Sequence, residues 1–139
     1  MSFAEIYQIA GAGMNAQTIR LNTVASNLAN AGAAAESPDQ AFRALKPVFS
    51  TIYKQTQEGE LAGAHVEVSA IVQSDAPLDL RYEPNHPFAD EQGYVAYSNV
   101  NTVEEMADMM AASRSFETNV EIMNRARSMQ QGLLQLGNK

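Results

Sequence analysis

The chain of 139 residues has no cysteine and no tryptophan, only two histidines and only nine basic residues. The absence of cysteine excludes disulfides, zinc–thiolate sites and a cysteine nucleophile. A net charge of −7 and a pI near 4.7 argue against nucleic acid as a partner, because nucleic-acid-binding proteins carry a basic stripe. No apolar run approaches the ~20 residues of a transmembrane helix, so we expect a protein that does not itself span a membrane.

The start of the chain, MSFAEIYQIAGAG, also lacks the basic residues that open a secretory signal, since the first cation is Arg20. We therefore expect no cleaved signal peptide, and export from the cytoplasm would need another route. The length fits one domain. With 45% hydrophobic and 18% charged residues, the composition is that of a globular protein rather than a disordered one.

Residues 1–31 are predicted to form a long helix. The run Ser2-Phe3-Ala4-Glu5 has the pattern of a capping box. Apolar residues then recur at alternating spacings of four and three, which is typical of a coiled-coil seam, and only Gln17 interrupts them. The stripe comprises Phe3, Tyr7, Ala10, Met14, Leu21, Val24 and Leu28. The other faces carry alanines and amides instead of charges. We interpret them as surface buried against other helices, the alternative being an ordinary amphipathic helix of a soluble bundle.

A second helix is predicted from about residue 101 toward the carboxy terminus. The run Thr102-Val103-Glu104-Glu105 is again a capping-box pattern. At ~1.5 Å per residue the helix would be roughly 50 Å long, too long for a compact chain of this size. Its apolar stripe drifts around the helix, which suits contacts with different partners along its length. The predicted packing residues are Val103, Met106, Met110, Phe116, Val120, Met123 and Leu134.

The middle of the chain is acidic and extended, with ten acidic against four basic residues in 36–91. Residues 65–72 alternate as a half-buried strand does, and 45–53 and 78–82 are weaker strand candidates. The stretch EPNHPFADEQGYVAYSNVN, residues 83–101, could be a site: an enzyme could use His86 with Asp90 or Glu91. Adjacent acids in an extended segment point to opposite sides, so we predict no catalytic, cofactor or metal site and interpret the stretch as a joint.

Two motifs resemble the bacterial flagellar rod and hook proteins, the axial family. ASNLANA, Ala25–Ala31, resembles their amino-terminal signature, although residues 32–44 lack the Asn-Thr that usually follows it. The stretch Tyr82–Met129 is similar to the carboxy-terminal half of a basal-body rod protein of the proximal rod. The motif residues are Asn27, Leu28, Ala29, Asn30, Pro84, His86, Pro87, Gly93, Tyr94, Asn99, Val100, Asn101, Glu104, Glu117, Asn119 and Asn124.

The resemblance implies a mainly α fold, with the two terminal helices paired as an antiparallel coiled coil around a small β or extended middle segment. The parts would be residues 1–31 and 101–139 in an inner coiled-coil domain and residues 32–100 outside it. It also implies a structural subunit of the flagellar proximal rod that transmits torque, with no cofactor. Its partners would be copies of itself, neighbouring proximal-rod proteins, the distal rod, a membrane-ring adaptor and the type III export apparatus. Another axial rod or hook subunit is the alternative.

Overall fold

A computed structural model describes residues 2–55 and 61–137 of the chain. Within these residues, two long helices flank five strands in the order of the sequence. The elements are α1 (Phe3–Ala29), β1 (Ala34–Ala35), β2 (Leu45–Gln55), β3 (Leu61–Gln73), β4 (Asp79–Tyr82), β5 (Tyr94–Tyr97) and α2 (Thr102–Gly137).

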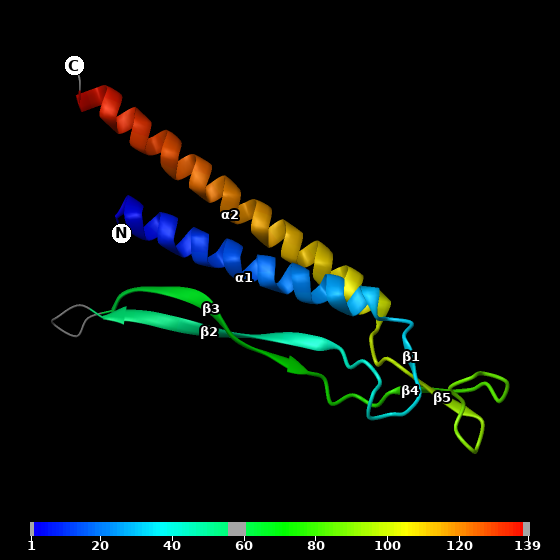
Figure 1. Ribbon diagram of the computed structural model, residues 1–139. Coiled ribbons are helices and arrows are strands. Elements are labelled where there is room, and N and C mark those ends of the chain that lie inside the picture. Colours follow the sequence, from blue (N-terminus) through cyan, green and yellow to red (C-terminus); the bar gives the residue numbers. More distant parts are fainter. Residues whose placement is uncertain (1, 56–60, 138–139) are drawn as a thin grey trace.

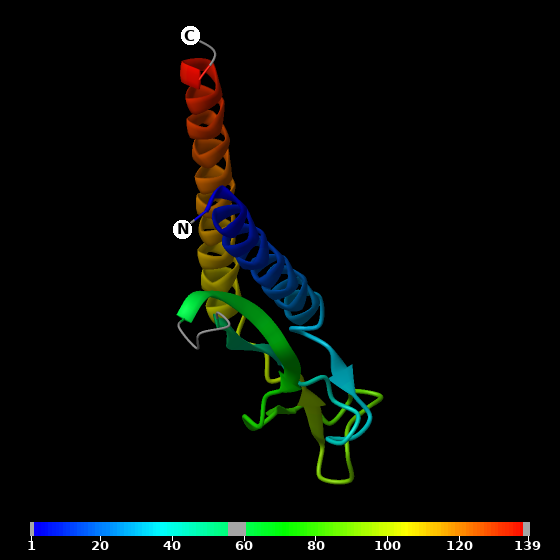
Figure 2. The same cartoon turned by 90° about the vertical axis from the view of Figure 1, so that its left-hand side faces the viewer.

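The two helices lie side by side, run in opposite directions and spread apart toward the chain ends (Figures 1 and 2). The capping box at the start of α1 is present: the Ser2 N–H donates to Glu5 Oε2 at 2.7 Å, and the Glu5 N–H donates to Ser2 Oγ at 3.3 Å. The start of α2 is capped by Asn101, whose Oδ1 accepts from the Val103 N–H at 3.1 Å. Within residues 2–55 and 61–137, neither helix combines the length and apolar character needed to cross a membrane.

The prediction of a mainly α fold with a small extended middle is wrong, because the middle forms two antiparallel sheets. Strands β2 and β3 make a long two-stranded ribbon that packs on α1, and α1 lies between this ribbon and α2 (Figure 1). A three-stranded sheet of order β1-β5-β4 sits where α1 ends and α2 begins (Figure 1).

The sequence pattern indicates these strands only weakly, and the reason is physical. Alternation of apolar and polar residues marks a strand only when one face is buried and the other is in water. All four residues of β4 are exposed, and the ribbon exposes large apolar side chains such as Phe49 and Val72. A register shift between Val48 and Phe49 also breaks the period of two.

The buried core is thin and made of small side chains. Its apolar members are Ala10, Ala16, Val24, Ala41, Ala44, Val95, Ala96, Ala112 and Ala126. Most of the large apolar side chains of α2 are exposed instead. A single copy of the chain therefore leaves much apolar surface in water, which in soluble proteins marks an interaction surface.

Candidate assembly interface

The contact between α1 and α2 is the part of the predicted assembly surface that one chain completes by itself. An Arg20 guanidinium nitrogen lies 2.6 Å from Asp108 Oδ1 at one end of the contact. The Tyr7 hydroxyl donates to Gln130 Oε1 at 3.4 Å at the other end. These pairs fix the antiparallel alignment of the two helices over most of the length of α1.

Between these two pairs, Gly13 of α1 lies directly against the side chain of Asn119 of α2. A Cβ atom placed on Gly13 would lie only 3.0 Å from Asn119 Nδ2 and 3.1 Å from Asn119 Oδ1. Such contacts are tighter than ordinary van der Waals packing allows. Gly11, two residues earlier on α1, has no atom within 4 Å of the equivalent position. A side chain at position 13 would therefore have to displace the Asn119 amide, whereas one at position 11 would meet nothing.

The predicted packing residues of α1 are all at least partly covered in the single chain. Val24 is buried, and the others are half-buried; these are Phe3, Tyr7, Met14, Leu21 and Leu28. Because α1 contacts α2 on one side and the β2–β3 ribbon on another, this cover comes from two directions.

The predicted packing residues of α2 are mostly exposed. Phe116 and Met123 are half-buried, whereas the exposed members are Val103, Met106, Met110, Val120 and Leu134. The buried residues of α2 are Glu105, Ala112 and Ala126. The buried apolar residues of α2 are thus alanines, and most of its large apolar side chains are exposed.

Asn27, from the amino-terminal motif, ties α1 to the ribbon. Its side chain is fully buried, its Nδ2 donates to the Leu45 carbonyl oxygen at 2.9 Å, and its Oδ1 accepts from the Leu45 N–H at 2.8 Å. The amide thereby pairs with the first residue of β2 as a neighbouring strand would. Sequence reasoning singled out Asn27 as a motif residue but did not predict this role.

Asn99, from the second motif, makes a similar set of hydrogen bonds from the segment between β5 and α2. Its Oδ1 accepts from the Ala44 N–H at 2.7 Å, and its Nδ2 donates to the carbonyl oxygens of Ser74 at 3.3 Å and Ala76 at 2.9 Å. Asn99 therefore holds the start of β2 and the end of β3, which lie at the same end of the ribbon, against the segment that leads into α2. Asn27 and Asn99 thus use their side-chain amides in the same way, to bond backbone groups at this end of the ribbon.

Lys46 adds an ionic contact between β2 and the first turns of α2. Its Nζ lies 3.1 Å from Glu104 Oε1, 3.2 Å from Glu105 Oε1 and 3.9 Å from Asp108 Oδ2. Burial acts to lower the pKa of Lys46, but the hydrogen bonds and charges of Glu104 and Glu105 outweigh it, so the pKa is raised. Glu105 is buried, so this pairing compensates a charge that would otherwise be costly to bury.

The stretch around His86 forms turns. His86 Nδ1 accepts from the Phe88 N–H at 3.1 Å, and the two rings stack edge to face. Asp90 Oδ1 accepts from the Tyr94 N–H at 2.8 Å, while Glu91 is exposed. Among the described residues, no three histidine, aspartate or glutamate side chains come together as metal ligands would. His86 and Asp90 thus bond the backbone of their own loop.

Gly93 closes this loop in the left-handed region, with φ of +86°. A Cβ atom there would lie 2.8 Å from the Tyr82 ring and 3.2 Å from Pro84 Cβ. The Tyr82 ring in turn packs edge to face on Tyr94. A residue other than glycine would be strained at this position by both its backbone and its surroundings.

The remaining motif residues lie around the joint and along the helices. Asn30 donates to the Ser26 carbonyl oxygen at 2.8 Å. Leu28 and Val100 are half-buried, and the exposed members are Ala29, Pro84, Pro87, Glu117 and Asn124. The motif therefore includes amides that bond to backbone groups near the ends of the two helices, and two exposed positions on α2, Glu117 and Asn124, for which no contact is found within the described residues.

The sequence of the chain is similar to families of known flagellar proteins. Residues 8–32 match the family described as flagella basal body rod protein, and residues 91–136 match the flagellar basal body rod FlgEFG protein C-terminal family. The chain is 42% identical over 137 residues to a flagellar basal-body rod protein FlgC of Salmonella typhimurium, with 99% of each chain covered. It is 39% identical to that of Yersinia enterocolitica, again with 99% of each covered, and 32% identical to that of Borreliella burgdorferi, with 87% and 88% covered. The chain therefore belongs to the FlgC family of flagellar basal-body rod proteins.

Proposed function

We propose that this chain, a structural subunit of the flagellar basal-body rod, is built into the proximal rod through its two terminal helices. Residues 1–31 and 101–139 would form the inner, helical part of the rod wall, and residues 32–100 would form the part outside it. In this arrangement the joint held by Asn27 and Asn99 carries load between the two parts, so that torque entering one is passed to the other.

The observation that carries this proposal is the uncovered apolar surface of α2. Large apolar side chains that a stable monomer would bury are exposed along the whole helix, from Val103 to Leu136. Burying apolar surface contributes roughly 25 cal/mol per Å², so neighbours that cover this helix stabilise the assembly strongly. The uncharged, small-residue surface of α1 supports the same use, because it lets other backbones approach closely.

As a rod protein, the chain works with other components of the basal body. We infer that its direct neighbours are copies of itself, the other proximal-rod proteins, the distal rod and a membrane-ring adaptor. We also infer export from the cytoplasm through the flagellar type III apparatus, without a cleaved signal. Full-length similarity to FlgC proteins favours this place in the rod over that of another axial subunit.

The chain is not an enzyme, since its relatives are named as basal-body rod proteins. The hypothesis of a small enzyme using His86 with Asp90 or Glu91 has no remaining support. Both His86 and Asp90 are occupied by bonds to the backbone of their own loop.

Single charges in the helical surface test the proposal. Leu21→Asp should allow export but prevent rod formation, because an unpaired charge buried in an interface costs several kcal/mol. Leu21→Met is the matched control and should swim normally. Val120→Asp should behave like Leu21→Asp, whereas Thr118→Asp, which is exposed nearby on α2, should be milder. Motility in soft agar and the yield of basal bodies are measured; normal values for both Leu21→Asp and Val120→Asp would refute the proposal.

A further inference from the structure

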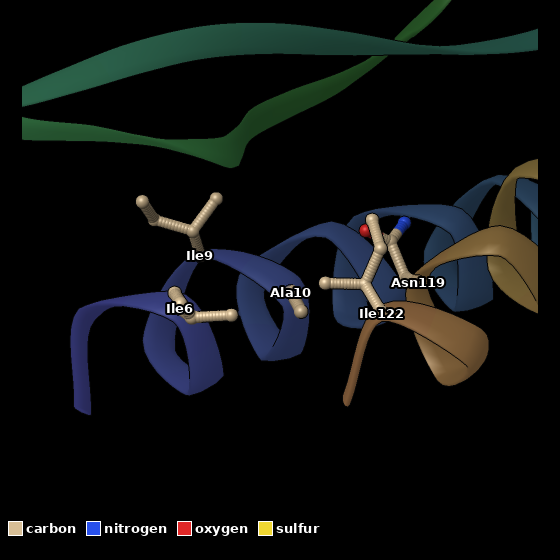
Figure 3. Close-up of a pocket in the computed structure, with 5 residues that line it drawn as sticks. All are labelled: Ile6, Ile9, Ala10, Asn119 and Ile122. Carbon is tan, nitrogen blue, oxygen red and sulfur yellow. The ribbon is translucent and has the colours of Figure 1, made fainter. Parts of the chain in front are cut away.

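An apolar groove opens where α1 and α2 spread apart. It has a volume of about 340 Å³ and is lined by Ile6, Ile9, Ala10, Asn119 and Ile122. Figure 3 shows Ile122 of α2 reaching toward Ala10 of α1, with Ile9 on the rim that faces the strands. Packed interiors have few voids larger than one water molecule. A groove of this size without a charged side chain in its lining is suited to receive apolar side chains.

The free end of α2 carries side chains that match such a groove. Met129, Leu133 and Leu136 are spaced by four and three residues and so lie on one face of the helix. They are 56%, 58% and 71% exposed. Residues 128–137 contain no charged residue at all, although both signs of charge occur on the preceding turns of α2. This stretch of α2 is thus uncharged, like the lining of the groove, and it carries a row of large apolar side chains.

The same molecule cannot bring these two surfaces together. Ile122 forms one wall of the groove and Leu133 lies eleven residues further along the same helix, about 16 Å away at ~1.5 Å per residue. No break interrupts α2 between them, so the end cannot fold back. The occupant must come from another molecule, and a second copy of the chain carries the required surface.

We propose that the groove of one copy receives the α2 end of a second copy, with Leu133 and its neighbours packed between Ile6, Ile9 and Ile122. The inference rests on the proposed function, in which copies of the chain assemble. Groove and end are different surfaces of each copy, so the contact is heterologous and each copy can bind one neighbour through each surface. Contacts of this kind build rings or open helical arrays rather than closed pairs, and either would place copies side by side around a rod.

Cysteine cross-linking tests the contact, because the natural chain has no cysteine. Two differently tagged copies, one with Ile9→Cys and one with Leu133→Cys, are produced in the same cells, and isolated basal bodies are oxidised. We expect a disulfide-linked dimer that contains both tags. In the control, Gln131→Cys replaces Leu133→Cys; it is exposed on the same turn but on the opposite face. Its yield should be about tenfold lower, since Cα atoms more than ~7 Å apart are not bridged.

Equal yields from the two pairs, no dimer, or a cross-link to a protein of another mass would each overturn the inference. The double variant Ile9→Cys, Leu133→Cys, oxidised as dilute purified protein, must not form a disulfide within one chain, because that would place the end in its own groove. Absence of the chain from basal bodies would count against the proposed function instead. The same mixed pair, oxidised as concentrated purified protein, then decides the inference: a mixed dimer supports it, and its absence refutes it.

Discussion

Replacing Asn27 by alanine removes the tie between α1 and the ribbon. The side chain is fully buried, and its amide makes both a donated and an accepted hydrogen bond with the backbone of Leu45. Asn27→Ala leaves the N–H and C=O groups of Leu45 without these partners. A buried polar group left unpaired costs about 1–3 kcal/mol, so two such groups predict a loss of roughly 2–6 kcal/mol in the free energy of unfolding.

The loss is measured by urea unfolding of the purified chain, followed by far-ultraviolet circular dichroism. Asn15→Ala is the matched control, since Asn15 is an exposed amide on the same helix and its replacement should change stability by less than about 0.5 kcal/mol. Asn27→Asp should not rescue the loss, because it turns a carboxylate oxygen toward the Leu45 carbonyl. If Asn27→Ala is as stable as Asn15→Ala, Asn27 does not hold α1 to the ribbon, and its assigned role is refuted.

Three further substitutions test other contacts. Gly11→Ala should stabilise α1 by up to about 1 kcal/mol in urea unfolding, whereas Gly13→Ala should lose that gain because its Cβ meets Asn119; equal gains would contradict the close crossing. Gly93→Ala should cost about 1–3 kcal/mol in the same assay, since φ is +86°, and an unchanged midpoint would contradict the strain. The pKa of Lys46 is raised, so its ion pairs stabilise the fold below the ordinary lysine value of about 10.4 and are lost as pH rises through the raised value. The stability difference between wild type and Lys46→Met should therefore shrink above that pH, and a difference that stays constant would be inconsistent with the pairing.

The first helix could be predicted closely from the sequence because its signals are local. The Ser2 and Glu5 capping box and the 3.5-residue spacing depend only on neighbouring residues, and the structure has the cap at Ser2 and the helix from Phe3 to Ala29. The ribbon is different. Its strands pair with each other, but they are also held by packing on α1 and by the amides of Asn27 and Asn99, which are distant from them in sequence.

The faces of the candidate interface could not be assigned from the hydrophobic pattern of the sequence alone. A stripe of large apolar residues predicts a packing face, but in a subunit made for assembly both the inner and outer faces of a helix are apolar. Here the buried apolar residues of α2 are the small Ala112 and Ala126, and large apolar residues such as Met106 and Leu134 are exposed. No periodicity in one sequence separates a face that meets its own chain from a face that meets a neighbour.

The most direct test of the account is a density map of isolated basal bodies at a resolution that shows side chains. The account predicts a set of rod subunits whose side chains fit this sequence, with α1 and α2 on the inner side of the wall and the β2–β3 ribbon outside them. It also predicts that neighbouring subunits cover the exposed face of α2. A map in which no rod subunit fits the chain, or in which the ribbon lies inside and the apolar face of α2 remains in solvent, would contradict it.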